Sequence, residues 1–505
     1  MRTKNSIKNI FWACIVFGIN IIFNFFSKKL FIQFLGPEYN GLNSLFSSII
    51  SMLSIVEMGI GTTIIYKLYE PVSKEQKEEI KSLMGFYKKS YNILAVIILI
   101  IGLILIPFLP SIIGKINIDV NIYIAYILFL LNSVFSYLLS YKRSILIVNQ
   151  KGRIIKKINL IYIVISNLLQ ITFLYYTKNY YLYLIIRMTC TVLENICITI
   201  KANKLYPYIL EKNKPLDKKT RLDLIKRIKA MFFHQIGGFI VNGTDNILLS
   251  VMFGVTLVGY YNNYFFIIST LISFIDSIFS AIVASVGNLL ADSNKEKTSD
   301  VYHNINFINF LIASYTACIF FMLIQPFIKF WLGESNLLGF DLSIWLTIYY
   351  YLRIMKFTAA SFKNAAGIFY EDRFIPLIES IVNLISSIVF AKLFGISGII
   401  MGTITSTLIL YTFSYPKYVY KGLLGKRIKD FYLYNLKYLL FTFILIVFSY
   451  FINNIFIFEN FLLELLKVTI IVSIIYISMI FIVYRNDSKL AYVKELVKKI
   501  LYKKS

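Results

Sequence analysis

The sequence predicts an all-α integral membrane protein with about fourteen transmembrane helices. Of its 505 residues, 58% are hydrophobic and 15% are charged, and the mean hydropathy is +0.70. A soluble chain of this length needs a far more polar surface than this composition supplies. Apolar runs of ~20 residues recur along the chain, and this length crosses a hydrocarbon core ~30 Å thick. Short basic clusters separate the runs.

The positions of the helices follow from the ends of the apolar runs, at charged clusters, glycines and prolines. The first run is too long for the apolar core of a signal peptide and lacks a small-residue cleavage site, so we expect it to be a helix of the protein. The spans are expected near residues 10–35, 42–66, 91–113, 119–140, 158–176, 180–200, 230–252, 258–290, 304–328, 338–362, 374–394, 397–416, 433–452 and 463–484.

The orientation of the helices follows from the distribution of basic residues. Of the 52 Lys and Arg residues, 41 fall in alternate loops that begin with the N-terminal segment. Only three fall in the intervening loops, at Lys115, Lys178 and Lys329. Cytoplasmic loops carry such an excess, and one missed or added helix midway would destroy the partition. We therefore expect both termini to lie in the cytoplasm and the protein to reside in the cytoplasmic membrane.

Several classes of function are disfavoured by composition. The net charge of +26 can indicate nucleic-acid binding, but the basic residues lie between apolar runs and not on a surface with exposed aromatics. Residues 422–427 have the wrong spacing for a phosphate-binding P-loop. Two histidines, His234 and His303, are too few for a His-based centre, and no nucleophile–base set occurs. We expect no enzyme activity, no cofactor and no metal. The cysteines show no disulfide or metal spacing and all lie in apolar runs, at Cys14, Cys190, Cys197 and Cys318.

The longest basic loop divides the chain into two halves. Residues 202–229 mix Leu and Ile with Lys, Arg and Asp, as an amphipathic surface helix does. We expect residues 1–201 to form an N-terminal lobe of six helices and residues 230–416 a C-terminal lobe of six helices. Residues 417–484 then add two helices, and residues 485–505 form a basic cytoplasmic tail.

An internal repeat supports this division. A shift of 218 residues aligns Gly36 with Gly254 and Gly41 with Gly259. An even number of helices in each copy makes the repeats parallel, related by an axis along the membrane normal, and two such lobes around a central cavity are typical of transporters. The same shift pairs, in register or a few positions off, Asn24 with Asn242, Leu30 with Leu248, Tyr39 with Tyr260 and Glu57 with Asp276.

Charged residues inside the predicted spans need a reason to be there. Each costs about 2.5–3.5 kcal/mol at the bilayer centre on insertion scales. Arg353 lies near the middle of its span, with Lys356 one turn further on the same face. Arginine is suited to a pair of phosphate oxygens, which favours a functional role for Arg353. Arg187 and Glu194 share a helix face two turns apart, too far for a direct ion pair.

The alternative for all of these charges is an interhelical contact that fixes packing. This alternative applies equally to Glu379, and it is favoured for Lys28 and Lys29, which lie close enough to the outer interface to extend toward water. Further acidic residues inside predicted spans are Glu57, Asp245 and Asp276.

Glycine-containing motifs carry a resemblance to a known family. Residues 35–41 (Leu-Gly-Pro-Glu-Tyr-Asn-Gly), followed by residues 57–61 (Glu-Met-Gly-Ile-Gly), resemble the helix 1–2 signature of Wzx-type polysaccharide flippases. Residues 244–250 (Thr-Asp-Asn-Ile-Leu-Leu-Ser), then Gly254 and residues 258–260 (Val-Gly-Tyr), resemble the helix 7–8 signature of that family, and residues 395–399 (Gly-Ile-Ser-Gly-Ile) also fit it. The resemblance spans most of the chain.

The resemblance implies a fold and a function. The family belongs to the multidrug/oligosaccharidyl-lipid/polysaccharide exporter (MOP) superfamily. It implies alternating access of two lobes that carries a polyprenyl-diphosphate-linked oligosaccharide from the inner to the outer leaflet for surface polysaccharide synthesis. Membrane lipids, a polysaccharide polymerase and glycosyltransferases are the expected partners, and nucleic acid is not. Arg353, Lys356 and Arg187 are the candidates for binding the diphosphate headgroup. The candidates for binding a coupling ion or for gating are acidic, namely Asp276, Glu57, Asp245 and Glu194.

Three other functions remain open from the sequence. A multidrug or cation antiporter of the same superfamily would need an acidic, aromatic cavity without a central arginine. A lipid II flippase would share both the fold and the headgroup chemistry. A membrane scaffold without transport would use the basic loops to organise glycosyltransferases.

Overall fold

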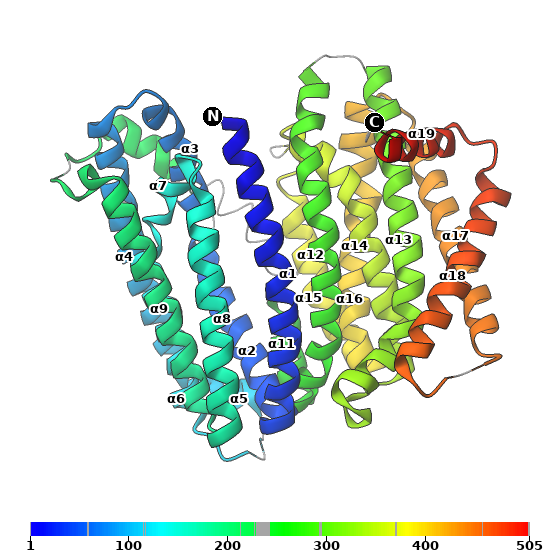
Figure 1. Ribbon diagram of the computed structural model, residues 1–505, viewed down its shortest axis with the longest axis horizontal. Helices are drawn as coiled ribbons and strands as arrows, with labels where there is room; N and C mark the ends of the chain where they lie inside the picture. The colour runs from blue at the N-terminus through cyan, green and yellow to red at the C-terminus, as the bar shows by residue number, and fades with distance from the viewer. Residues whose placement is uncertain are drawn as a thin grey trace. The chain divides into compact units, whose positions relative to one another are not determined.

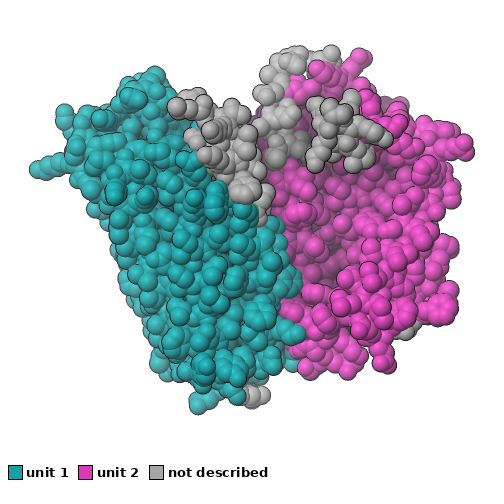
Figure 2. All heavy atoms as spheres, viewed as in Figure 1, with its two compact units in different colours: residues 1–262 teal, residues 263–505 magenta. Residues whose placement is uncertain are grey.

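The structure is a computed structural model, and it describes residues 2–57, 60–114, 116, 118–212, 214–226, 228, 243–291, 295–368, 371–456 and 458–502. Within these ranges every regular element is a helix, so the predicted all-α membrane fold is confirmed. The chain forms two compact units, Met1–Asn262 (unit 1) and Asn263–Ser505 (unit 2), coloured separately in Figure 2. The boundary falls inside a helix, α12 (Val255–Ala291).

Unit 1 is built from long apolar helices that pack side by side. Helix α8 packs against α1 and α9, and α6 packs against α4 and α9 (Figure 1). The elements are α1 (Arg2–Leu35), α2 (Pro37–Leu53), η1 (Ser54–Glu57), α3 (Ile60–Ser73), α4 (Lys77–Leu105), η2 (Ile106–Phe108), α5 (Leu109–Ile113), α6 (Ile122–Ser140), α7 (Arg143–Val148), α8 (Gly152–Thr177), α9 (Tyr180–Leu205), η3 (Pro207–Leu210), α11 (Asp245–Phe253) and the start of α12 (Val255–Ala291).

Unit 2 is organised around α13, which packs against α14, α17 and α18. Helices α15 and α16 form a tight hairpin, and the short basic helix α19 lies across the end of α13 (Figure 1). The elements after α12 are α13 (Lys295–Leu332), η4 (Glu334–Asn336), α14 (Phe340–Ala365), α15 (Ile375–Phe394), α16 (Ile396–Ile409), the π-helix η5 (Leu410–Leu423), α17 (Ile428–Asn453), α18 (Phe461–Tyr484) and α19 (Ser488–Tyr502).

Eleven helical segments of the described chain are long and apolar enough to cross a membrane. Each coincides with one of the fourteen predicted spans. The three other predicted spans differ for separate reasons. Residues 338–362 form α14, which is long enough but carries several charges. Residues 230–252 lie largely outside the described residues. The prediction of one continuous helix over residues 42–66 is wrong, because the 3₁₀ segment η1 interrupts it.

The internal repeat is visible in the backbone. Gly36 ends α1 and Gly254 ends α11 with nearly the same left-handed conformation, at φ 95° and ψ 172° in one copy and φ 87° and ψ 160° in the other. A residue with a Cβ rarely adopts such dihedrals, so glycine suits both positions. Later turns repeat with almost the same spacing, because Gly114 corresponds to Gly333 and both have positive φ.

The two copies of the glycine motif contact each other within unit 1. A Cβ added at Gly41 would collide with the carbonyl oxygen of Val255, and one added at Gly259 would collide with the carbonyl oxygen of Pro37. Val255 follows Pro37 by the repeat spacing, so each copy makes the same backbone contact to the other. The side-chain amide of Asn40 also donates to the carbonyl oxygen of Gly259 at 2.8 Å. This contact, which we call the glycine crossing, holds the start of α12 against α2.

The glycine crossing explains where the compact units divide. It and the packing of α11 on α2 keep residues 245–262 with unit 1. The lobe boundaries expected from the sequence repeat, including the linker at 202–229, remain a prediction. The described part of that linker does pack on unit 1, because Leu224 is fully buried and Asp223 forms an ion pair of 3.3 Å with Lys67 of α3.

We expect Gly41→Ala to destabilise the protein by about 1–3 kcal/mol, because the new methyl group must push apart two helix backbones. Gly18→Ala in α1 is the matched control, since nothing lies within 4 Å of a Cβ at that position. Alanine also favours a helix over glycine. Thermal unfolding of both variants in detergent measures the difference. Equal melting temperatures for the two variants would contradict the glycine crossing.

Candidate functional site

Helix α14 carries two of the predicted headgroup residues in unit 2. Arg353 and Lys356 are both half-buried and lie one turn apart on the helix. The guanidinium carbon of Arg353 lies 5.9 Å from the centre of the Tyr349 ring, within the range of a cation–π contact. Its Nε atom is buried and has no hydrogen-bond partner among the described residues. A buried guanidinium N–H without an acceptor is costly, so this atom is suited to receive a ligand.

Acidic groups face the same part of α14. Lys356 interacts electrostatically with Glu379 of α15 and Asp276 of α12, and with the neighbouring cations Arg353 and Lys363. Glu379 is 8% exposed, whereas Asp276 is exposed. The structure therefore brings together three of the predicted site residues, Arg353, Lys356 and Asp276, and adds Glu379 to them. We call Asp276, Arg353, Lys356 and Glu379 the α14 charge cluster.

A buried ion pair lies at the end of the α14 charge cluster. Lys363, in the last turn of α14, pairs with Asp372, whose side chain is only 2% exposed. The hydroxyl of Ser414 on η5 donates to the same carboxylate at 2.9 Å. Sequence analysis placed Lys363 in a cytoplasmic loop, and the carboxylate that it binds lies nine residues further along the chain. Only the turn between α14 and α15 brings the two groups together.

The π-helix η5 supplies tyrosines beside Arg353. The Tyr411 hydroxyl donates to the carbonyl oxygen of Leu352 at 2.9 Å, and both Tyr411 and Tyr415 interact electrostatically with Arg353. Pro416 lies inside this segment and lacks the N–H that an α-helix would require. π-helical segments are frequent at functional sites, but no sequence pattern distinguishes this one from an ordinary helix.

The third predicted headgroup residue, Arg187, belongs to unit 1. It is exposed on α9, and its guanidinium carbon lies 5.6 Å from the centre of the Phe129 ring on α6. Arg353 and Lys356 belong to unit 2. A shared site formed by all three cations therefore remains a prediction.

Glu194 is already held by an arginine. Arg143, at the start of α7, pairs with Glu194 at 2.8 Å and also donates to the side-chain oxygen of Asn195 at 2.8 Å. Asn159 donates to the same carboxylate at 3.2 Å. Sequence analysis missed Arg143 because it counted this residue among the loop cations. These contacts favour the packing alternative for Glu194.

Glu57 lies at the interruption between α2 and α3, where tyrosines surround it. The Tyr91 hydroxyl donates to the Glu57 Oε1 atom at 2.6 Å, and the Tyr87 hydroxyl donates to that of Tyr91 at 3.2 Å. A Cβ at Gly61 would lie 3.0 Å from the Tyr87 hydroxyl. The carboxylate thus ends a chain of hydrogen bonds from two tyrosines one turn apart on α4. The remaining acidic candidate, Asp245, is buried in the first turn of α11, where the helix dipole favours a negative charge.

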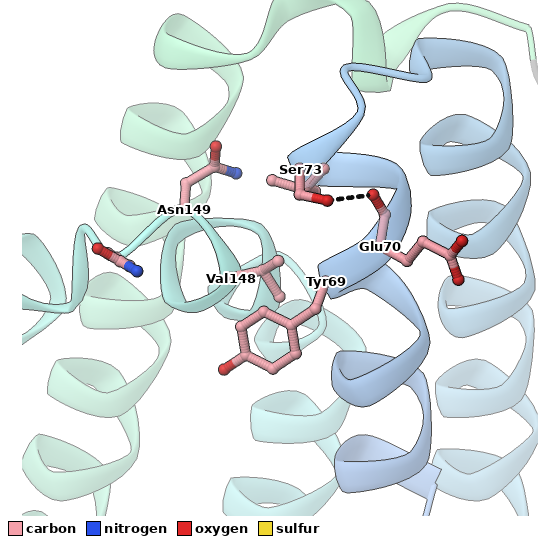
Figure 3. A pocket seen from close by; sticks show the side chains of 7 residues that line it. Tyr69, Glu70, Ser73, Val148 and Asn149 are labelled. Atoms are coloured by element: carbon pink, nitrogen blue, oxygen red, sulfur yellow. Dashed lines mark hydrogen bonds between the residues drawn. The ribbon is translucent and has the colours of Figure 1, made fainter. Parts of the chain in front are cut away.

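A cavity of about 610 Å³ lies in unit 1 between the end of α3 and the turn after α7 (Figure 3). The Ser73 hydroxyl donates to the backbone oxygen of Glu70 at 2.8 Å. The hydrogen bond from the Lys74 ammonium holds the pKa of the Glu70 carboxyl below its usual range. Sequence analysis did not predict this cavity. Its lining is polar, from Tyr69, Glu70, Val72, Ser73, Val148, Asn149 and Gln150. Across the described residues, no group of three His, Cys, Asp or Glu side chains is placed to hold a metal ion.

We expect Asp372→Asn to destabilise the protein by about 3–5 kcal/mol, because it leaves the Lys363 ammonium buried without its counter-charge. Asp430→Asn is the control, since Asp430 pairs with an arginine, Arg427, whose side chain is 86% exposed. An exposed pair contributes about 1 kcal/mol at most. Thermal unfolding in detergent compares the variants, and equal losses would show that the Lys363–Asp372 pair is not buried as described.

The fold is similar to that of several solved transporters. A structure described as the lipid II flippase MurJ in an inward closed conformation has a TM-score of 0.67 and 19% identity, with 94% of this chain and 99% of that chain covered. An inward-facing multidrug resistance MATE family transporter of the MOP superfamily has a TM-score of 0.59 and 14% identity, with coverage of 77% and 92%. A mutant of the Vibrio cholerae MATE transporter VcmN has a TM-score of 0.54 and 13% identity, with coverage of 81% and 94%. At these identities the likeness establishes the fold alone.

The sequence comparisons establish the family. No curated protein matches the chain. A family model described as polysaccharide biosynthesis protein matches residues 30–337, which is more than half of the chain. The match includes both copies of the glycine motif that carried the resemblance to Wzx-type flippases. The chain therefore belongs to the polysaccharide biosynthesis protein family and has the fold of the MOP superfamily transporters.

Proposed function

We propose that this protein flips a polyprenyl-diphosphate-linked oligosaccharide from the inner to the outer leaflet of the cytoplasmic membrane, for surface polysaccharide synthesis. The observation that carries the proposal is the half-buried Arg353, whose Nε atom lacks an acceptor in the described structure, with Lys356 one turn away. These cations lie on a helix of a multi-pass membrane protein that belongs to a polysaccharide biosynthesis family.

The chemistry of the diphosphate fits these residues. A planar guanidinium binds two phosphate oxygens at once, and an ammonium adds a second positive charge. Both interactions are stronger in a partly buried site than in water. The lipid tail stays in the bilayer while the headgroup crosses, so only the headgroup needs polar partners.

The membrane potential assists the proposed movement. An anionic headgroup that leaves a negative cytoplasm gains about 2.3 kcal/mol per charge for each 100 mV. The proposal places both termini in the cytoplasm, because the basic loops then lie on the side where they are enriched in membrane proteins. The two repeats would expose the headgroup site to each side in turn.

One alternative substrate has a specific observation in its favour. The lipid II flippase MurJ is covered over 99% of its length by this chain, so the whole fold of that transporter is present here. Lipid II also has a diphosphate headgroup, and the sugar and peptide parts distinguish the two substrates. A multidrug or cation antiporter is less well supported, because a cationic substrate would be repelled by Arg353 and Lys356.

We expect Arg353→Ala to lower the rate of headgroup flipping by about 10- to 100-fold, the effect of losing a charge-assisted bidentate contact. The measurement is leaflet exchange of a fluorescent polyprenyl-diphosphate oligosaccharide in liposomes, with and without an imposed potential. Arg427→Ala is the matched control, because among the described residues Arg427 pairs only with Asp430, and its side chain is 86% exposed.

Two results would contradict the proposal. The first is exchange no faster than in empty vesicles with several different glycans, from protein that is folded and incorporated. The second is equal exchange by the wild type and by Arg353→Ala at equal incorporation, which would remove Arg353 from the headgroup site. Faster exchange of lipid II than of oligosaccharide lipids would favour the lipid II alternative.

A further inference from the structure

The cavity of unit 1 lies between two helix ends that the fold holds firmly together. Helix α3 packs on α7, and both contribute to one hydrophobic core, in which Leu68, Ile145 and Leu146 are fully buried. Val148, which is 5% exposed, extends this core to the wall of the cavity. Side chains on such packed elements are positioned before a ligand arrives. We call this site the α3–α7 cavity, and its lining residues are Tyr69, Glu70, Val72, Ser73, Val148, Asn149 and Gln150.

The α3–α7 cavity offers no free charge to a ligand. Its described lining contains no lysine or arginine, and the one acidic lining residue, Glu70, pairs with Lys74 at 2.7 Å. Lys151 follows the lining in sequence, but its ammonium nitrogen lies 4.8 Å from the centre of the Tyr206 ring. A phosphate or a metal ion therefore finds little electrostatic attraction here, whereas an uncharged polar ligand needs none.

Hydrogen-bonding groups of the lining remain available. The Asn149 Nδ2 atom donates to the carbonyl oxygen of Ile145 at 2.8 Å, which orients the amide and leaves its oxygen without a described partner. The Tyr69 side chain is 49% exposed, and its hydroxyl bonds to no described residue. The Ser73 hydroxyl donates within α3 and can still accept a hydrogen bond. Figure 3 shows Ser73 and Asn149 on opposite walls, with the Tyr69 ring below them in the view.

The backbone at Gln150 has an unusual conformation. Its φ of 56° is uncommon for a residue with a side chain. The turn is held by two hydrogen bonds, from the Gln150 N–H to the oxygen of Ile147 at 2.9 Å and from the Lys151 N–H to the oxygen of Leu146 at 2.8 Å. Residues in such conformations cluster at ligand sites. This turn ends α7 and places the Gln150 amide in the lining.

The surroundings of the α3–α7 cavity place it in water. Glu70 and Lys74 are exposed beside it, which the hydrocarbon core of a membrane would not allow. Both helix ends belong to basic loops that we expect to lie in the cytoplasm. In a lipid-linked oligosaccharide the diphosphate lies at the membrane surface and the sugars extend into water. A sugar site is therefore expected outside the hydrocarbon core.

The lining fits the surface of a sugar ring. A pyranose has hydroxyl groups around its edge and C–H groups on its faces. Amide and hydroxyl side chains both donate and accept hydrogen bonds, as sugar hydroxyls require. The Tyr69 ring adds an apolar face with a polar tip. The volume of about 610 Å³ lies within the range of about 300–1,000 Å³ that is typical of small-molecule sites.

We propose that the α3–α7 cavity binds uncharged sugar rings of the lipid-linked oligosaccharide on the cytoplasmic side of the membrane. The inference rests on the proposed function and assigns the glycan part of that substrate to its own site in unit 1. The cations of α14 would bind the diphosphate that all such lipids share, whereas the α3–α7 cavity would select among glycans. A site built to hydrogen-bond sugar hydroxyls rejects glycans that leave its polar groups unpaired.

The test is saturation-transfer NMR of full-length protein in a detergent without a sugar headgroup. The probe is the oligosaccharide released by mild acid from the lipid-linked pool of cells that make this protein. It carries neither lipid nor diphosphate, so it reports sugar binding alone. We expect transfer to sugar protons for the wild type and equally for Arg353→Ala. Tyr69→Ala should raise the dissociation constant about tenfold, because the ring and its hydroxyl are both lost.

Two further variants control for folding and for location. Tyr69→Phe keeps the ring and should bind within about threefold of the wild type. Tyr66→Ala is the matched control, because Tyr66 lies one turn earlier on α3, is 67% exposed and does not line the cavity. Its affinity should equal that of the wild type. An equal loss in Tyr66→Ala and Tyr69→Ala overturns the inference, since the sugar would then bind another face of α3.

Leaflet exchange of the intact lipid-linked oligosaccharide separates the inference from the proposed function. Exchange by wild-type protein that shows no transfer to the released sugar overturns the inference and leaves the proposed function intact. Sugar binding by wild-type protein that exchanges no lipid overturns the proposed function, and with it the assignment of the sugar to a flipped lipid. Exchange together with sugar binding that depends on Tyr69 supports both.

Discussion

A charged side chain between apolar helices needs a partner within the protein, because lipid offers none. The arrangement of polar contacts in this chain depends on this constraint. Several partly buried charges of the described residues have a direct partner. Arg143 holds Glu194, Lys363 holds Asp372, and Glu464 of α18 holds Lys467 at 2.8 Å. The guanidinium of Arg353 differs, because its buried Nε atom has no hydrogen-bond partner among the described residues. Charges that pair with each other fix packing, whereas this atom can bind a ligand.

The sequence was sufficient for the features that depend on local composition. Runs of apolar residues have the length of a bilayer, so eleven spans could be located before any contact was known. The repeat could be found because both copies have glycine at the same two positions. Gly36 and Gly254 have a positive φ, and Gly41 and Gly259 each lie against a backbone carbonyl group of the other copy. The basic face of Arg353 and Lys356 was also evident, because helical spacing alone places them together.

The features that sequence analysis missed depend on contacts between distant segments. Arg143 and Lys363 were counted as loop cations, because hydropathy does not reveal that each reaches a carboxylate of another segment. The interruption at η1 was missed because Glu57 lies in an apolar run, and its tyrosine partners come from α4. The π-helical geometry of η5 was equally hidden, because a π-helix and an α-helix share the same apolar periodicity over a few turns. These features arise from tertiary packing and not from local pattern.

The glycine crossing has a consequence for how such a chain can evolve. Each copy supplies both the glycine and the carbonyl group that the other copy's glycine must approach. Neither copy can therefore gain a side chain at its glycine without displacing the backbone of the other copy. Differences between the halves are therefore expected to concentrate where the copies do not touch, as at the α14 charge cluster.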